Sequence, residues 1–165
     1  DSNRLTELRK FMVLRRFILL ALLCGVIGLV PDLSQAQVKF ETSRVSIVTA
    51  GGTYNVSVEM ATTPEQRSLG LMGRKDMPLA AGMLFDFERT EPITMWMKNT
   101  FIPLDMIFID RSGRIVLIVE NTTPFSTDVI ASPGPVLAVL ELNGGTAARL
   151  AIKTGDRVIH DIFRP

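Results

Sequence analysis

From Arg44 to the end of the chain, apolar or alternating runs of strand length follow one another with turn residues between them. Runs of this kind at intervals of about 8 to 12 residues are typical of all-β domains. No regular alternation of strands with helical segments is present, which argues against a parallel α/β sheet. Eight strands are expected, at residues 44–49, 54–60, 82–87, 93–98, 104–110, 114–120, 136–142 and 157–163. The sequence therefore predicts a mainly β fold, an antiparallel β-sandwich or jelly-roll-like barrel of about eight strands.

Two short helices are expected between these strands. The segment Thr63-Pro64-Glu65-Gln66 combines an N-cap residue, a proline at the first helical position and a glutamine that completes a capping box. This helix is expected to end near Gly70 or Gly73, because glycine often follows the last helical residue. A second helix over residues 147–152 is expected to have Thr146 as its cap, and residues 121–135 are expected to form the longest loop.

The first 36 residues have the plan of a secretory signal peptide and are expected to form a signal helix. A basic pair at residues 15–16 precedes an apolar run over residues 17–30, and residues 34–36 form a small-x-small cleavage site. A spanning helix needs about 20 apolar residues, so an uncleaved membrane anchor is the weaker alternative. Cleavage is expected between Ala36 and Gln37.

This leader predicts where the rest of the chain acts. Residues 37–165 are expected to form a single domain in the periplasm or outside the cell, and residues 1–11 are expected to precede the true start at Met12. Cleavage removes the only cysteine, Cys24, so packing alone has to stabilise the domain. Residues 37–165 carry 13 Lys and Arg against 14 Asp and Glu, and this net charge of about −1 disfavours nucleic acid as a partner.

Several motifs along the domain occur in a characteristic order. They are Gly70-Leu71-Met72-Gly73-Arg74, Gly82-Met83-Leu84-Phe85-Asp86-Phe87, Met95-Trp96-Met97-Lys98-Asn99-Thr100, Pro103-Leu104-Asp105-Met106-Ile107-Phe108, Leu140-Glu141-Leu142 with Gly145, and Ile152-Lys153-Thr154-Gly155-Asp156-Arg157-Val158. The domain in this respect resembles the domain of unknown function family 192, also called uncharacterised protein family 0127. The resemblance implies a compact, mainly β domain of sandwich or jelly-roll type, often behind a bacterial signal peptide. It implies no established catalytic activity.

The most suggestive polar cluster lies where one expected strand ends and the next begins. Strand alternation places Trp96 and Lys98 on the same face, away from the apolar face of that strand. Asn99 and Thr100 follow at the turn, and Asp105 returns on the next strand. In such a site Trp96 would stack on a polar ligand such as a sugar, and the amide, ammonium and carboxylate groups would direct hydrogen bonds. The structural alternative is that Lys98 pairs with Asp105, Asn99 shapes the turn and Trp96 fills the core.

Two arginines and a further glutamate complete the candidate site residues. Arg67 and Arg74 lie in and after the first expected helix, where they either bind an anion or form structural ion pairs. Arginine suits both uses because its planar guanidinium makes bidentate contacts with carboxylates. The expected partners for such pairs are Glu59, Glu141 and Asp105.

Seven methionines remain after cleavage, and Met95 and Met97 form a Met-x-Met pair. Thioethers are soft ligands that suit copper(I), which makes a periplasmic copper(I)-binding protein one alternative function. The two side chains share the apolar face of their expected strand, however, where methionine is an adaptable core filler. No other metal and no cofactor is expected.

Catalytic groups are scarce in the domain. His160 is the only histidine, so a Ser-His-Asp triad or a zinc site depends on it entirely, and a lone strand histidine is more often structural. A hydrolase acting on a cell-envelope or carbohydrate substrate would need two carboxylates about 5 to 9.5 Å apart across a cleft. Its candidates are Asp86, Asp105, Glu120 and Glu141.

The sequence thus favours a non-catalytic protein of the bacterial envelope that binds a ligand or partner near Trp96. The partner is expected to be a small molecule or an envelope protein, and membrane contact is expected only through the signal segment if this segment stays uncleaved. No catalytic residue is assigned.

Overall fold

The computed structural model of the protein describes residues 38–163. The expected signal helix, its cleavage site at Ala36 and Gln37, and the expected start at Met12 lie outside the described residues. Within residues 38–163, no helix has the length and apolar character needed to cross a membrane.

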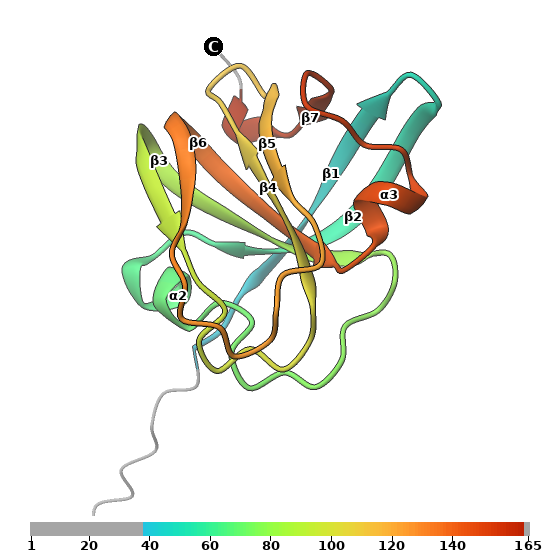
Figure 1. Ribbon diagram of the computed structural model, residues 1–165. Coiled ribbons are helices and arrows are strands. Elements are labelled where there is room, and N and C mark those ends of the chain that lie inside the picture. Colours follow the sequence, from blue (N-terminus) through green and yellow to red (C-terminus); the bar gives the residue numbers. More distant parts are fainter. Residues whose placement is uncertain (1–37, 164–165) are drawn as a thin grey trace, which may run out of the picture. The chain divides into compact units, whose positions relative to one another are not determined.

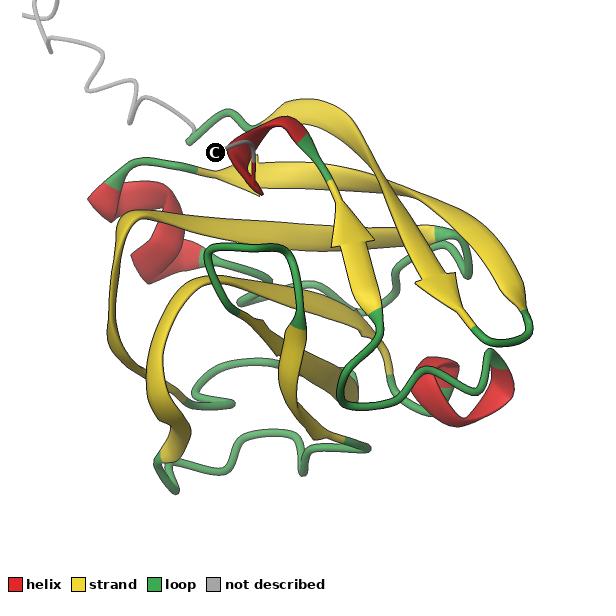
Figure 2. Ribbon diagram, turned by 90° about the horizontal axis from the view of Figure 1, so that it is seen from above, coloured by secondary structure: helices red, strands yellow, loops and turns green. Residues whose placement is uncertain are grey.

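Strands dominate the described chain, which confirms the mainly β expectation (Figure 1). The elements in order are β1 (Glu41–Thr49), β2 (Gly52–Ala61), α2 (Pro64–Leu69), β3 (Ala81–Met95), β4 (Leu104–Ile109), β5 (Ile115–Val119), β6 (Ile130–Asn143), α3 (Thr146–Arg149), β7 (Arg157–Ile159) and a 3-10 turn, η2 (Asp161–Phe163). Figure 2 shows the strands curling around a common interior, with the helices at the periphery.

The strands form one curled sheet in the order β5-β4-β6-β3-β2-β1-β7. This sheet is a half-barrel, whereas the sequence predicted a sandwich or a jelly-roll-like barrel. Neighbouring strands are antiparallel except for β2 and β3, which run parallel because α2 and the segment after it carry the chain back to the starting edge. The two ends of the sheet approach each other where Arg114 bridges Arg157, and the Val158 N–H donates to the Gly113 carbonyl at 2.8 Å. Gly113 has φ +81, and a Cβ there would lie 2.5 Å from the Val158 oxygen, so this approach requires glycine.

Seven strands replace the expected eight because residues 82–87 and 93–98 do not form separate strands. Residues 82–87 and 93–95 both belong to β3, which stays paired with β6 on either side of an irregularity between Asp86 and Glu91, while residues 96–98 follow the end of β3. The Asp86 carboxylate accepts the Glu88 N–H at 2.8 Å, and Glu88 has φ 63, so a local turn is built into the strand. Its partner β6 begins at Ile130 and not at Val136, which shortens the expected long loop.

Local signals in the sequence predicted two other features correctly. The hairpin of β1 and β2 turns at Ala50 and Gly51, between the first two expected strands. Thr63 and Gln66 form the expected capping box at α2, which ends before Gly70. The expectations for the last elements were wrong in detail. Thr146 is inside α3 and its N-cap position is Gly145, while β7 ends at Ile159 and continues into η2.

Apolar side chains gather on both faces of the curled sheet. One cluster takes side chains from every strand and fills the concave face, with Ile47, Leu84, Ile107 and Leu140 among its most buried members. A second cluster occupies the opposite face of β3, β4 and β6, where Leu71, Met97 and Ile102 from connecting loops cover it. The loops between strands therefore take part in the core, and their other side chains are presented to solvent from fixed positions.

Candidate functional site

Two loops at one end of the sheet are joined into a single unit. One is the connection 96–103 between β3 and β4, and the other is residues 120–129 between β5 and β6. The Met97 N–H donates to the Ser126 carbonyl at 3.0 Å, and the Phe125 N–H donates to the Thr100 carbonyl at 3.2 Å. The backbone of each loop thus fixes the other.

Buried side chains anchor this pair of loops to the outer core. Met97 and Ile102 belong to the outer apolar cluster, and Thr100 and Thr122 are also buried. The Thr122 hydroxyl donates to the Leu104 carbonyl at 2.9 Å and lies 3.1 Å from the Met97 sulfur. These contacts give the loops a defined conformation without a bound partner.

On this anchored base, three aromatic side chains remain about half exposed. The exposed fractions are 50% for Trp96, 46% for Phe101 and 54% for Phe125. The two phenylalanine rings meet edge to face with centroids 4.8 Å apart, and the Lys98 ammonium lies 5.3 Å from the Trp96 ring centroid. We call Trp96, Lys98, Phe101 and Phe125 the aromatic loop surface.

Backbone conformation also marks these loops. Asn99, Asn121 and Phe125 have positive φ values of 56, 49 and 62. Asparagine tolerates this region, whereas an aromatic side chain there is an outlier that costs free energy. Asn99 shapes its turn in this way, and its carbonyl accepts the Gly73 N–H at 2.9 Å. The fold holds Phe125 strained and half exposed, a combination that favours a role outside the stability of the domain.

The structure separates Asp105 from this surface. Its carboxylate is fully buried and accepts three backbone N–H groups, from Asn121 at 2.9 Å, Gly145 at 3.0 Å and Ala147 at 2.7 Å. It supplies the cap that Gly145 cannot give α3, and it also fixes the start of the loop at Asn121. Lys98 is over Trp96 and not beside Asp105, and Trp96 is not in the core, so these two parts of the structural alternative were wrong. Its third part, that Asn99 shapes the turn, agrees with the positive φ of Asn99.

Glu141 is buried on the other face of the sheet from Asp105. Asp105 is opposite Leu142 in the register of β4 and β6, and Glu141 is opposite Met106. Because successive side chains of a strand point to opposite faces, the sheet itself separates the two carboxyl groups. Burial raises the pKa of Glu141 to about 8, so its carboxyl is protonated at neutral pH.

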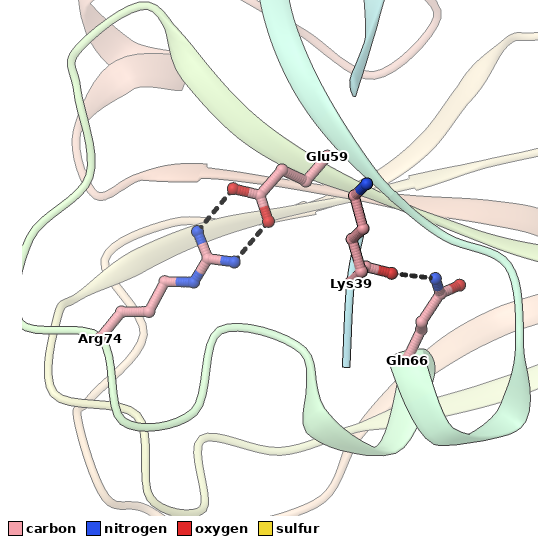
Figure 3. A network of polar contacts seen from close by, with 4 residues as sticks. All are labelled: Lys39, Glu59, Gln66 and Arg74. Carbon is pink, nitrogen blue, oxygen red and sulfur yellow. Dashed lines mark hydrogen bonds and ion pairs between the residues drawn. The ribbon is translucent and has the colours of Figure 1, made fainter. Parts of the chain in front are cut away.

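The two arginines have structural partners. Arg74 forms a bidentate ion pair with Glu59 (Figure 3), which is one of the partners expected for it. The Arg74 guanidinium also lies 5.8 Å from the Phe40 ring centroid. The pair lowers the pKa of Glu59 and raises that of Arg74 through their hydrogen bonds. Arg67 donates to the carbonyls of Thr62 and Asp86. Neither guanidinium points to the aromatic loop surface.

His160 does contact a serine, with 2.9 Å between its Nε2 and the Ser43 hydroxyl. Its Nδ1 accepts the Ile162 N–H at 3.3 Å, so in the neutral ring Nε2 carries the proton and donates to Ser43. A histidine in this tautomer cannot take the serine proton, and the contact is therefore structural. Within residues 38–163, no group of three or more His, Cys, Asp or Glu side chains is placed to hold a metal.

Two clefts lie away from the aromatic loop surface. One of about 290 Å³ is lined by Asp86, Glu88, Arg89, Thr90, Arg111, Leu137 and Ile162. The other, of about 180 Å³, is bordered by the Glu59–Arg74 pair. Trp96 and its neighbours line neither cleft. The half-exposed aromatic side chains are open to solvent, an arrangement that suits an extended partner.

Sequence reasoning found Trp96, Lys98 and Asn99 but missed Phe101 and Phe125. A signal was present for Phe125 alone, which interrupts a stretch rich in threonine, serine and proline. Their pairing depends on contacts between two loops distant in sequence, which no local pattern reports.

Comparisons with known proteins concern the family and the fold of the chain. The profile of the DUF192 family, described as uncharacterized ACR, matches residues 46–160. A crystal structure from Sinorhizobium meliloti 1021, described as a "putative transcription regulator", is 49% identical over 74% of this chain and 96% of its own, with a TM-score of 0.73. A protein of unknown function from Novosphingobium aromaticivorans DSM 12444 is 35% identical over 82% of this chain and 94% of its own, with a TM-score of 0.72. No curated protein matches the chain.

Proposed function

The chain belongs to the DUF192 family, whose description assigns no activity, and we propose that it is a non-catalytic protein of the bacterial envelope that binds glycan chains on its aromatic loop surface. The observation that carries this proposal is the half exposure of three aromatic side chains on loops whose neighbouring side chains are buried. Such residues would be expected in the core unless a partner covers them.

Glycan is the partner class that best fits the chemistry of this surface. Sugar rings stack on tryptophan through their C–H faces, and Trp96 exposes half of its side chain. Lys98 and Asn99 are exposed beside it and supply donors for sugar hydroxyls. An open surface also accepts a polymer that extends beyond it.

The alternatives have less support. A hydrolase that pairs Asp105 with Glu141 is opposed by their positions on opposite faces of the sheet. A copper site made of Met95 and Met97 is opposed by the Met97 sulfur, which is buried against the Thr122 hydroxyl. A DNA-binding role is not proposed, because the net charge of residues 37–165 is about −1 and supplies no basic excess for phosphates.

The envelope location is proposed from the leader. Export would place the domain beside peptidoglycan, the major glycan polymer of that compartment. The lack of cysteine after residue 36 makes the domain insensitive to the redox state of the compartment.

Truncation of the aromatic loop surface is expected to separate binding from stability. Trp96→Ala should weaken co-sedimentation with purified peptidoglycan sacculi at least about tenfold, because aromatic anchors dominate such contacts. The same change should alter the free energy of unfolding by less than about 1 kcal/mol, because Trp96 is half exposed. Phe125→Ala should act in the same direction.

Leu79→Ala provides the matched control, since Leu79 is 76% exposed and lies outside this surface. It should leave sedimentation unchanged. Failure of the unaltered chain to sediment, or equal sedimentation of Trp96→Ala and Leu79→Ala, would contradict the proposal.

A further inference from the structure

A row of side chains crosses the outer face of the sheet next to Glu141. Glu59 on β2 is in register with Met83 on β3, Met83 with Glu141 on β6, and Glu141 with Met106 on β4. Residues in register on one face have Cβ atoms about 4.5 to 5.5 Å apart, so both methionines flank the Glu141 side chain. Met83 and Met106 are fully buried, and Glu141 is 4% exposed.

The two glutamates of this row have different surroundings. The Glu59 charge is compensated by Arg74 (Figure 3). Glu141 is 4% exposed, and no hydrogen bond or ion pair of its side chain is found within residues 38–163. Burial raises the pKa of its carboxyl. A buried carboxyl without a partner costs free energy that an apolar residue would not. Its position between two thioethers is therefore the feature to explain.

The segment between α2 and β3 covers this row. Arg74 ties one part of it to Glu59, and Met77 packs against the outer core. The Asn143 side chain, on the same face as Glu141, donates to the carbonyls of Met77 and Pro78, both at 3.0 Å. The segment forms no helix or strand from Arg74 to Ala80. Its charged residues are Arg74, which pairs with Glu59, and Lys75 and Asp76, which are exposed.

We propose that Met83, Glu141 and Met106 form a binding site for a soft monovalent cation, copper(I) or its analogue silver(I). Two thioethers select soft cations over sodium or potassium, which prefer oxygen ligands. Because the Glu141 carboxyl is protonated at neutral pH, binding of the cation releases this proton to solvent. The resulting carboxylate compensates the single positive charge, so the occupied site is neutral. A divalent cation would leave an uncompensated charge in the core, which is costly. This site is independent of the aromatic loop surface and goes beyond the proposed function.

Silver(I) titration followed by native mass spectrometry and calorimetry tests the proposal, because silver(I) needs no reductant. All chains carry Cys24→Ser, since a thiol binds the same cations. The reference chain should bind one equivalent saturably and show a raised melting temperature. Glu141→Gln, Met83→Leu and Met106→Leu should each weaken binding about tenfold or more.

Two control variants keep the result specific. Met60→Leu changes a buried methionine on the opposite face of the sheet, and His160→Gln removes the only imidazole. Both should bind silver(I) as the reference does. Circular dichroism establishes that each variant is folded. Absence of saturable binding, or binding that survives all three ligand substitutions, would overturn the proposal.

Discussion

Asp105→Ala is expected to destabilise the domain by about 4 kcal/mol or more, enough to unfold a domain of ordinary stability. The substitution leaves three backbone N–H groups without their acceptor, and one of them belongs to the fully buried Ala147. Each unsatisfied buried donor costs about 1 to 3 kcal/mol. Asp105→Asn should have an intermediate effect, since it keeps one acceptor oxygen. Urea unfolding measures these free energies.

The turn at Asp110 supplies the control for this prediction. One oxygen of its carboxylate also accepts backbone N–H groups, from Ser112 at 2.8 Å and Arg114 at 3.0 Å, but these bonds are exposed. Water can replace the lost acceptor there, so Asp110→Ala should cost only about 1 kcal/mol. Equal losses for Asp105→Ala and Asp110→Ala would contradict the role assigned to Asp105.

Glu141 is expected to make the domain less stable as pH rises. Its carboxyl has a pKa of about 8 when folded and an ordinary value of 4.5 when unfolded, so the unfolded chain releases the proton first. The stabilisation is fully present below pH 4.5 and is lost as pH rises toward 8. Each pH unit removes about 1.4 kcal/mol, which gives a total of about 5 kcal/mol.

Glu141→Gln isolates this effect, because glutamine is similar in size and does not ionise. The variant and the reference chain should have similar free energies of unfolding at pH 5, and the variant should be several kcal/mol more stable at pH 8. Urea unfolding from pH 5 to pH 8 provides the measurement. Parallel curves for the two chains over this range would show that the carboxyl is not buried as described.

The parts of the fold that depend on neighbours in sequence could be predicted. Thr63 and Gln66 indicate the start of α2 in the sequence, because both partners of the capping box lie within one turn of helix. The glycines after β1 report the hairpin for the same reason. Strand positions also followed largely from alternation. The exceptions are Glu88, where a strand with an internal turn resembles two strands in sequence, the start of β6 and the end of β7.

The features that the sequence could not reveal depend on contacts between distant residues. The cap of α3 comes from Asp105, 42 residues before Ala147, so Thr146 was a reasonable but wrong choice. The parallel pairing of β2 with β3 is decided by how the connection between them crosses the sheet. The neighbours of Glu141 on its face of the sheet are set by the registers of four strands, β2, β3, β6 and β4. At the candidate site, the residue types pointed to Trp96 and Lys98 as binding residues. The exposure of Trp96 and its separation from Asp105 depend on the fold and could not be predicted.

The central claim, that the aromatic loop surface binds glycan, can be tested through Trp96 itself. It is the only tryptophan of the chain, so all tryptophan emission reports on this surface. Titration with soluble glycan strands released from peptidoglycan should shift the emission to shorter wavelength and saturate, because stacking removes the indole from water. Phe125→Ala should weaken this response and Leu79→Ala should not. Emission that stays unchanged at all glycan concentrations would contradict the claim.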